Sequence, residues 1–422
     1  MSDRDSRFSS ARALSGLATM ATVLAGLAVA PDATAHSSGA QTSSPVVVVL
    51  RDNVDSSAVA ARHGRRVGVR VTRVFSKALN GYAATVTPRE RAALQADEAV
   101  LFVADDVEVR VTTKAATQVL PTGVNRIEGE RSSAGSGDGR GSVDADIAVI
   151  DGGFQLDHPD VDIRPGIDCV GLGYANGGNH GLAVGGVAAA ADNGIGVVGV
   201  SPGARIWAIG TQNANGSGLV SNVICGLDWV VAHADTIEVT NMSLAALGTD
   251  DGKCGRVNGD AMHVAICRVV AAGVTVVASA GNDGSDAATR VPAAYSEVIT
   301  VSGVADFDGI PGGLGSDCLK NAAVLVHDDT FAYFSNYGAV VDIAAPALCL
   351  LSTDLKSKYS LHDGTSFASP HVAGAAALYL AAHPNATPAQ VRRALVDAGR
   401  FDYDSTLDPD RIKEPLLDVS TF

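Results

Sequence analysis

A serine in a glycine-bounded turn opens the most informative segment of this chain, residues 364–374, Gly-Thr-Ser-Phe-Ala-Ser-Pro-His-Val-Ala-Gly. The apolar, alanine-rich run from Val372 to Ala382 predicts a buried helix that ends near His383. At a helix start, free N–H groups and the positive end of the helix dipole converge, so an oxyanion formed beside Ser366 would be stabilised. Serine is a weak nucleophile by itself, and this chemistry therefore requires a nearby base.

A histidine and a carboxylate that could activate the serine lie earlier in the chain. Residues 146–151, Asp-Ile-Ala-Val-Ile-Asp, predict a buried parallel strand with Asp151 at its carboxyl end, where open α/β sheets place their sites. His180 precedes a second helix of small residues, 182–191. The order aspartate, histidine, serine is that of subtilisin and differs from the orders in chymotrypsin and the α/β-hydrolases.

Four segments together resemble the subtilisin family of serine endopeptidases: the Asp151 strand, the His180 helix, residues 279–282 (Ser-Ala-Gly-Asn) and the Ser366 helix. The resemblance runs from about 118 to 398. It implies that Ser366 attacks the peptide carbonyl, that His180 transfers the proton, and that Asp151 orients the imidazole. The Asn282 side chain and the Ser366 backbone N–H would hold the oxyanion. The expected function is hydrolysis of polypeptide substrates through an acyl-enzyme, with no organic cofactor.

Three departures from the family pattern leave a second class of function open. Gly152 replaces the usual serine or threonine, residues 181–186 read Gly-Leu-Ala-Val-Gly-Gly instead of Gly-Thr-His-Val-Ala-Gly, and Ala245-Ala246 replaces a Gly-Gly pair. The alternative is a catalytically weak or inactive protease-fold protein that acts in binding or as a scaffold. The intact triad favours the enzyme. An α/β-hydrolase esterase is disfavoured by the residue order and by Ala368, where that motif requires glycine.

The resemblance also implies residues that bind substrate. Ser243, Leu244 and Ala245 are expected to form an edge strand that pairs with an extended peptide, with Gly281 nearby. Alignment of the flanking segments places Arg290 at the base of the primary specificity pocket. A guanidinium there would favour Glu or Asp before the cut. The alternative is that the side chain of Arg290 turns to solvent.

A structural calcium site is implied by the same resemblance. Six oxygens, a number that suits Ca²⁺, would come from the side chains of Gln118, Asp160 and Asn193 and from the carbonyls of Ala191, Ile195 and Val197. The alternative is an ordinary Asn-Gly turn at residues 193–194.

The pattern of elements predicts an α/β fold, a parallel β-sheet with helices on both faces, preceded by a small α+β domain. From residue 146 onward, predicted strands (204–209, 237–242, 274–279 and 298–301) alternate with predicted helices (219–234 and 259–272). Residues 306–329 are glycine-rich and polar and predict a surface insertion. Ahead of this unit, strands at 46–50, 66–75, 82–86 and 99–111 and helices at 56–63 and 87–94 give a βαββαβ order.

This order resembles the inhibitor-type propeptide of secreted subtilisins, although an unrelated α+β domain is the alternative. Residues 1–35 have the pattern of a signal peptide: three arginines, an apolar run from 13 to 30, and Ala-Thr-Ala at 33–35. An uncleaved anchor is the alternative. The predicted organisation is a signal peptide (1–35), an inhibitor-like propeptide (36–114) cut between about 109 and 117, and a catalytic domain (115–422). The mature enzyme is expected to be extracellular, without a membrane anchor, and inhibited by its own propeptide.

Bulk composition agrees with a secreted globular protein. The chain of 422 residues has a net charge of −15, which argues against nucleic acid or anionic membrane as a partner. An even number of cysteines in an exported protein predicts disulfides. Their spacing weakly favours the pairs Cys254–Cys267 and Cys318–Cys349 and leaves the remaining pairing open.

Overall fold

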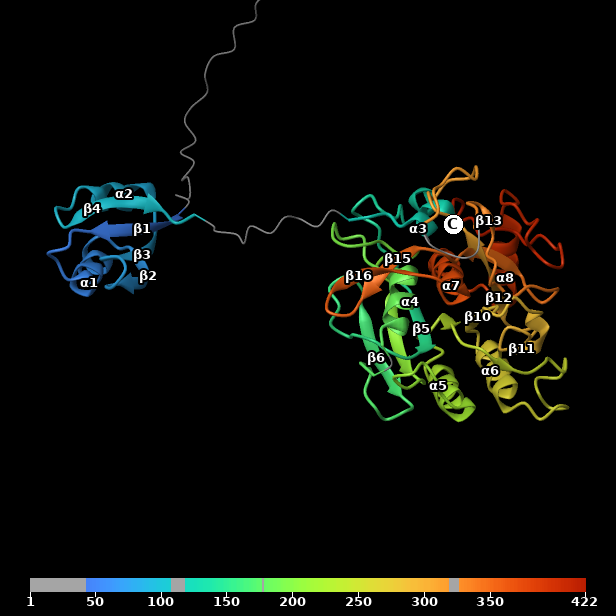
Figure 1. Ribbon diagram of the computed structural model, residues 1–422. Coiled ribbons are helices and arrows are strands. Elements are labelled where there is room, and N and C mark those ends of the chain that lie inside the picture. The colour runs from blue at the N-terminus through green and yellow to red at the C-terminus, as the bar shows by residue number, and fades with distance from the viewer. Residues whose placement is uncertain (1–42, 108–117, 177, 319–325) are drawn as a thin grey trace, which may run out of the picture. The chain divides into compact units, whose positions relative to one another are not determined.

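The computed structural model describes residues 43–107, 118–176, 178–318 and 326–422. The predicted signal peptide and the predicted cleavage region at 109–117 lie outside these ranges. The chain divides into two compact units between Thr112 and Thr113 (Figure 1). In the described ranges, no helix is long and apolar enough to cross a membrane.

The N-terminal unit is a four-stranded antiparallel sheet with two helices, in the predicted βαββαβ order. The strand order is β2-β3-β1-β4. Asp55 caps the first helix, and Thr87 with Glu90 forms a reciprocal capping box on the second. The elements are β1 (Ser44–Leu50), α1 (Ser56–Arg66), β2 (Arg70–Phe75), β3 (Gly81–Val86), α2 (Pro88–Gln95) and β4 (Val100–Asp105).

The C-terminal unit is built on a largely parallel sheet, which confirms the predicted fold class. The strand order is β13-β12-β10-β8-β5-β7-β6, and β14 also pairs with β12. Only the β12–β13 pair of this sheet is antiparallel among the described strands. The strands are β5 (Asp146–Asp151), β6 (Ile163–Asp168), β7 (Arg205–Gly210), β8 (Val239–Met242), β10 (Thr275–Ser279), β12 (Ile299–Ala305), β13 (Thr330–Phe331) and β14 (Ile343–Pro346).

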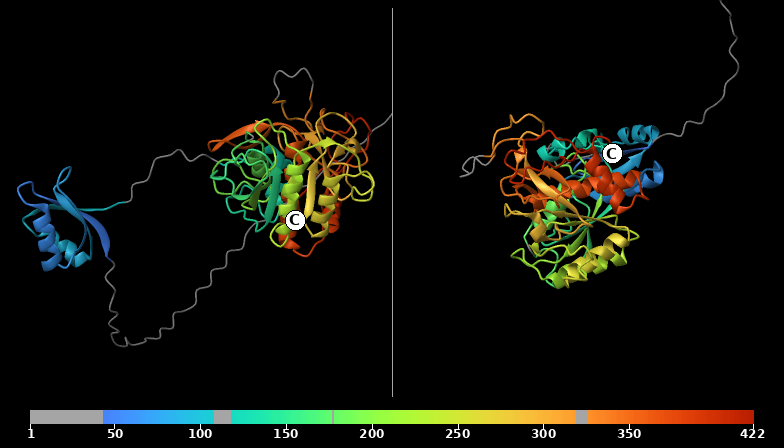
Figure 2. Two further views of the ribbon diagram at one scale, coloured as in Figure 1. Left: turned by 90° about the horizontal axis from the view of Figure 1, so that it is seen from below. Right: turned by 90° about the vertical axis from the view of Figure 1, so that its right-hand side faces the viewer.

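Helices cover both faces of this sheet. One apolar core joins α4 (His180–Ala189), α7 (Thr365–Ala382) and α8 (Pro388–Ala398) to one face, and a second core joins α5 (Val220–Ala232) and α6 (Ala261–Ala271) to the other. The right-hand view of Figure 2 shows the red and yellow-green helices on opposite sides of the strands. The remaining elements are α3 (Thr122–Arg126) and two short antiparallel pairs, β9 (Ala246–Leu247) with β11 (Arg290–Val291), and β15 (Leu350–Asp354) with β16 (Lys358–His362).

Small residues let α4 and α7 pack closely on the sheet. A Cβ on Gly186 would lie 2.3 Å from Thr353 Oγ1, and one on Gly374 would lie 2.8 Å from the carbonyl of Ala188. Larger side chains would push the helices away from their neighbours. The same close packing brings the first residues of both helices, His180 and Thr365, to the edge of the sheet where β5 ends.

Three disulfides join all six cysteines, as predicted: Cys169–Cys225, Cys254–Cys267 and Cys318–Cys349. Their Cα separations of 6.0, 6.0 and 6.5 Å suit the bond. The prediction of a surface insertion at 306–329 is wrong for its two ends. Asp306, Asp328 and Asp329 are buried, because buried polar contacts close the base of the segment.

Candidate active site

Asp151 and His180 form a hydrogen-bonded pair at the carboxyl edge of the sheet. Asp151 is fully buried as the last residue of β5, and both of its carboxylate oxygens lie 2.9 Å from Nδ1 of His180. The N–H of Gly152 donates to Asp151 Oδ1 at 2.7 Å and helps to fix the carboxylate. The negative charge of Asp151 raises the pKa of His180 and outweighs the opposing effect of burial.

Ser366 lies in the first turn of α7, close to His180. The hydroxyl of Ser243 donates to the carbonyl of Ser366 at 2.7 Å, and the ring of Phe367 packs 5.3 Å from the His180 ring. Within the described ranges, no hydrogen bond joins Ser366 Oγ to His180 Nε2, a contact that commonly tightens only when substrate binds. His180 lines one cavity and Ser366 lines a second, and the two cavities share residues 243–246. The structure thus brings the three predicted catalytic residues to one site.

Asn282 is held with its amide nitrogen beside the start of α7. Its Oδ1 accepts hydrogen bonds from the backbone N–H of Thr365 at 2.9 Å and from the Thr365 hydroxyl at 2.8 Å. Nδ2 would lie 3.4 Å from a Cβ built on Gly364, two residues before Ser366. Sequence reasoning missed Thr365, whose only signal was a hydroxyl residue between Gly364 and Ser366.

The predicted substrate residues line one cavity of ≈ 490 Å³ together with Ser366 and Asn282. It contains Ser243, Leu244, Ala245, Gly281 and Arg290. Residues 243–245 are not part of a strand, since β8 ends at Met242 and no neighbouring segment pairs with them in the described chain. The expected edge strand is therefore not formed at 243–245 in the described chain, and pairing of this segment with a substrate peptide stays a prediction.

Arg290 faces this cavity, but its charge is already matched. Its Nε donates to Asp283 Oδ2 at 2.8 Å, and NH1 donates to the Thr289 hydroxyl at 3.1 Å. The Arg290 side chain is 19% exposed and that of Asp283 is 55% exposed. The side chain of Arg290 therefore does not turn to solvent, which was the alternative. Asp283 was not predicted as a site residue, because nothing in the sequence pattern indicates its pairing.

The predicted calcium ligands also lie close together, because Gln118 and Asp160 contact the loop 191–197. Gln118 Nε2 donates to the carbonyls of Ala191 and Val197 at 3.0 and 3.3 Å. Asp160 is fully buried, and its two oxygens accept from Asn193 Nδ2 at 3.1 Å and from the N–H of Val197 at 3.0 Å.

The oxygen atoms of these residues are ligands of the kind that Ca²⁺ binds. A 180° rotation of the Gln118 amide would bring Oε1 to the side of the two carbonyls, in exchange for the hydrogen bond that Oε1 accepts from the Gly194 N–H at 2.9 Å. Asp160 supplies a negative charge. Burial raises the pKa of Asp160, so the carboxylate is held where a cation would stabilise its ionised form. Ile195 lies in the same loop, and its N–H donates to Asn193 Oδ1 at 3.0 Å.

Comparison with known proteins relates both units of the chain to known families. Residues 144–409 match the subtilase family, and residues 30–112 match the peptidase inhibitor I9 family. Subtilisin NAT of Bacillus subtilis subsp. natto is 33% identical over 340 residues, which cover 79% of each chain. An alkaline protease of Alkalihalobacillus alcalophilus is 34% identical over 316 residues, 74% of this chain and 71% of that protein.

A solved structure shares the fold. The crystal structure of a cold adapted subtilisin-like serine proteinase superposes with a TM-score of 0.52 at 28% identity, and covers 65% of this chain and 88% of that chain. The fold and site define a serine-type endopeptidase preceded by an inhibitor-type propeptide domain. The chain belongs to the subtilase family.

Proposed function

We propose that this endopeptidase cuts polypeptides through an acyl-enzyme on Ser366. The observation that carries the proposal is the buried Asp151 carboxylate bound to Nδ1 of His180, which leaves Nε2 free to take the proton of Ser366. His180 then returns that proton to the leaving amine, while Asp151 stabilises the imidazolium. The Ser366 N–H and Asn282 Nδ2 hold the oxyanion.

The packing around the departures from the family pattern supports an active enzyme over a scaffold protein. A Cβ on Gly152 would lie 2.9 Å from Cβ of Gln212, so this position has no room for serine or threonine. Leu182 and Ala183 are fully buried, and their carbonyls accept from the hydroxyls of Thr353 and Ser352 at 2.9 and 2.7 Å. Local packing therefore accommodates these residues without displacing His180.

The N-terminal unit is proposed to be an inhibitory propeptide of a secreted precursor. Its fold and its match to the inhibitor I9 family support this role. The proposed boundaries are a signal peptide at 1–35, a propeptide at 36–114 and a catalytic domain at 115–422, with self-cleavage between about 109 and 117.

A fluorophosphonate probe tests the mechanism and the maturation together. The purified wild-type protein should be labelled at Ser366, and Ser366→Ala should both lose the label and accumulate as the uncut precursor. Ser221→Ala is the control, since it removes an exposed hydroxyl from the first turn of another helix, α5, and should keep the label. Labelling that survives Ser366→Ala would refute the assignment, and normal trimming of that variant in a protease-free host would refute self-processing.

Calcium bound by Gln118, Asp160 and the loop 191–197 is proposed as a stabiliser of the mature enzyme. An ion that binds only the native state adds RT ln(1 + [L]/Kd) to stability, so a chelator should lower the thermal midpoint of wild type. Asp160→Asn should abolish most of that response, whereas Asp157→Asn, an exposed neighbour, should keep it. An Asp160→Asn protein with the wild-type chelator response would reject this site.

A further inference from the structure

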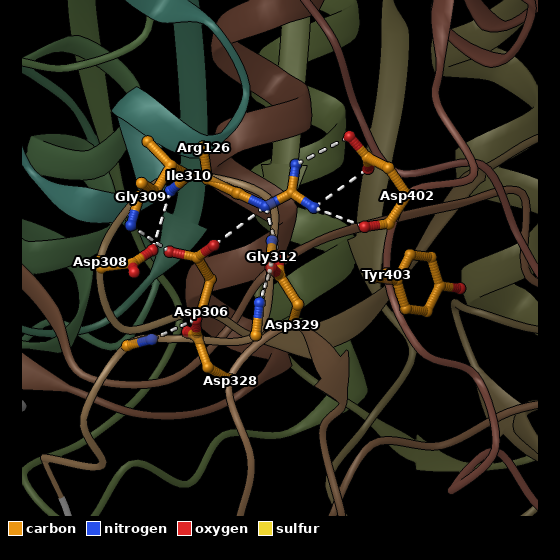
Figure 3. Close-up of polar contacts among 12 residues, drawn as sticks. Arg126, Asp306, Asp308, Gly309, Ile310, Gly312, Asp328, Asp329, Asp402 and Tyr403 are labelled. Carbon is orange, nitrogen blue, oxygen red and sulfur yellow. Dashed lines mark hydrogen bonds and ion pairs between the residues drawn. The ribbon is translucent and has the colours of Figure 1, made fainter. Parts of the chain in front are cut away.

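Two sets of polar contacts tie distant segments of the C-terminal unit together. One surrounds the buried guanidinium of Arg126, which pairs with Asp306 and Asp329 and involves none of the predicted site residues (Figure 3). The other joins the hairpin β15–β16 to α4, the helix that begins at His180. Of these two sets, only the second reaches a residue next to His180, so it is the one that can affect the reaction.

The start of α4 is not capped in the usual way. Asn179 occupies the cap position, where an asparagine side chain normally accepts from the second or third N–H of the helix. Here those two N–H groups, of Gly181 and Leu182, donate instead to the carbonyls of Gly152 and Gly153 at 2.8 and 3.0 Å. In the described chain the Asn179 side chain makes no capping bond, and it is therefore free for another partner.

That partner is Asp354, the last residue of β15. Asn179 Nδ2 donates to Asp354 Oδ1 at 2.6 Å, and because an ionised carboxylate can only accept, the amide nitrogen must face it. Burial acts to raise the pKa of Asp354, but the hydrogen bonds from Asn179, Leu355 and Ser360 outweigh burial and lower the pKa. The bond is therefore charge-assisted, which makes it stronger than a bond between two neutral groups.

The hairpin that carries Asp354 is itself bonded to both segments that supply the Asp151–His180 pair. The hydroxyls of Ser352 and Thr353 donate to carbonyls of α4 at 2.7 and 2.9 Å. At the turn of the hairpin, the Lys356 N–H donates to Oε1 of Gln155, in the loop after Asp151, at 2.6 Å. Asp354 is thus held in place on both sides.

The His180 ring depends on its backbone for its position, because the side chain is 35% exposed. Asp151 and Phe367 contact the ring, but packing does not enclose the rest of it. Asn179 directly precedes His180, so its bond to Asp354 limits the movement of the backbone that carries the ring. Catalytic geometry is sensitive to such movement, since a displacement of about 1 Å can lower a rate by roughly 10²-fold.

We propose that Asn179 and Asp354 are positioning residues, which hold the backbone of His180 so that its ring stays on Asp151 and within reach of Ser366. Both residues act through His180 and not on the substrate. The inference rests on the proposed acyl-enzyme mechanism, and its test is therefore made against an active wild type.

The test compares single and double variants, expressed as the full chain and incubated until processing is complete. Asn179→Ala and Asp354→Ala should each lower kcat by roughly ten- to thirtyfold and keep KM within about twofold of wild type, because the lost bond orients a proton-transfer group and does not hold the peptide. The double variant should lose no more than the slower single variant, because both substitutions remove the same bond. Lys358→Ala is the matched control, since this exposed residue lies opposite Asp354 on the same hairpin and should keep the wild-type kcat.

Two further readouts separate positioning from a loss of stability. Asp354→Asn keeps an oxygen that can accept from Asn179, so its kcat should stay within about threefold of wild type. Asn179→Ala should move the acid limb of kcat/KM to lower pH, because a ring that moves away from Asp151 loses the charge that raises its pKa. This variant changes no charge and leaves the titratable neighbours Asp151 and His362 in place, so a lower thermal midpoint alone would not move the limb.

Unchanged kcat in both single variants would overturn the proposal, as would losses that multiply in the double variant. An Asp354→Asn enzyme as slow as Asp354→Ala would also overturn it. If Asp354→Ala does not fold, Asn179→Ala and Asp354→Asn still decide the question. These outcomes leave the role of Ser366 intact, whereas a wild type without turnover or probe label would refute the proposed function and this inference with it.

Discussion

The catalytic end and the specificity end of the active site are held in different ways. At the catalytic end, Asp151 and Thr365 are fully buried. Asp151 holds the His180 imidazole and Thr365 holds the Asn282 amide, each through two short hydrogen bonds. At the specificity end, Arg290 is held by Asp283, whose side chain is 55% exposed. Buried polar contacts allow little freedom, whereas an exposed ion pair contributes little and is screened by salt. The reaction geometry is therefore fixed by the core, while the proposed substrate preference would rest on a contact that is easily changed.

The largest effect should come from the oxyanion hole. Asn282→Ala removes the amide donor and should lower kcat by roughly 10²–10³, the loss known for the equivalent asparagine of subtilisin. Thr365→Val keeps the backbone N–H bond to Asn282 but removes the hydroxyl's bond to Asn282 and the one that it accepts from the Gly281 N–H. Its loss should be smaller, about tenfold.

Kinetics with one peptide substrate would check both values, and Thr236→Val, in the turn before β8, provides a control threonine that lines neither cavity of the site. A Thr365→Val enzyme with wild-type kcat would show that buried contacts do not control the catalytic end, and the comparison would fail.

A smaller effect is expected at Arg290, which is proposed to favour Glu or Asp before the cut. Because Asp283 shares the guanidinium, the wild type should show only part of this preference, and Asp283→Asn should raise kcat/KM for a Glu peptide by about tenfold. Arg290→Ala should remove the preference. The measurement is kcat/KM for matched peptides ending in Glu, Leu or Phe. If all three proteins cut Leu and Phe best by the same margin, Arg290 does not select the substrate.

The smallest effect is the position of the acid limb of the pH profile. Only neutral His180 can accept the proton of Ser366, so kcat/KM should fall as the pH decreases through the pKa of His180. Asp151 raises that pKa above the ordinary value of about 6.5, so activity is lost at a higher pH than for an unpaired histidine. Asp151→Asn should move the midpoint of its residual activity to lower pH. A midpoint that does not move would show that the carboxylate does not set the proton affinity.

Much of the site could be predicted because its residues lie at the ends of strongly patterned elements. The buried run before Asp151 and the small-residue helices after His180 and Ser366 place these side chains at one edge of a parallel sheet. Thr365 and Asp283 could not be assigned, because their roles depend on the side-chain geometry of two turns. The insertion ends at Asp306 and Asp328 were predicted as surface because their polar composition gives no sign of burial.

By itself, the sequence determined the α/β alternation, the order of the three predicted catalytic residues and the N-terminal α+β unit, and it weakly favoured two of the disulfide pairs. Each depends on hydrophobic periodicity, on a residue at an element end, or on short spacing along the chain. Only the tertiary structure decided that Thr365 anchors Asn282, that Asp283 neutralises Arg290, and that Asp306 is buried beside Arg126, 180 positions away by residue number. These contacts join loops that are distant in sequence, and polar side chains carry no periodic signal of which partner they meet.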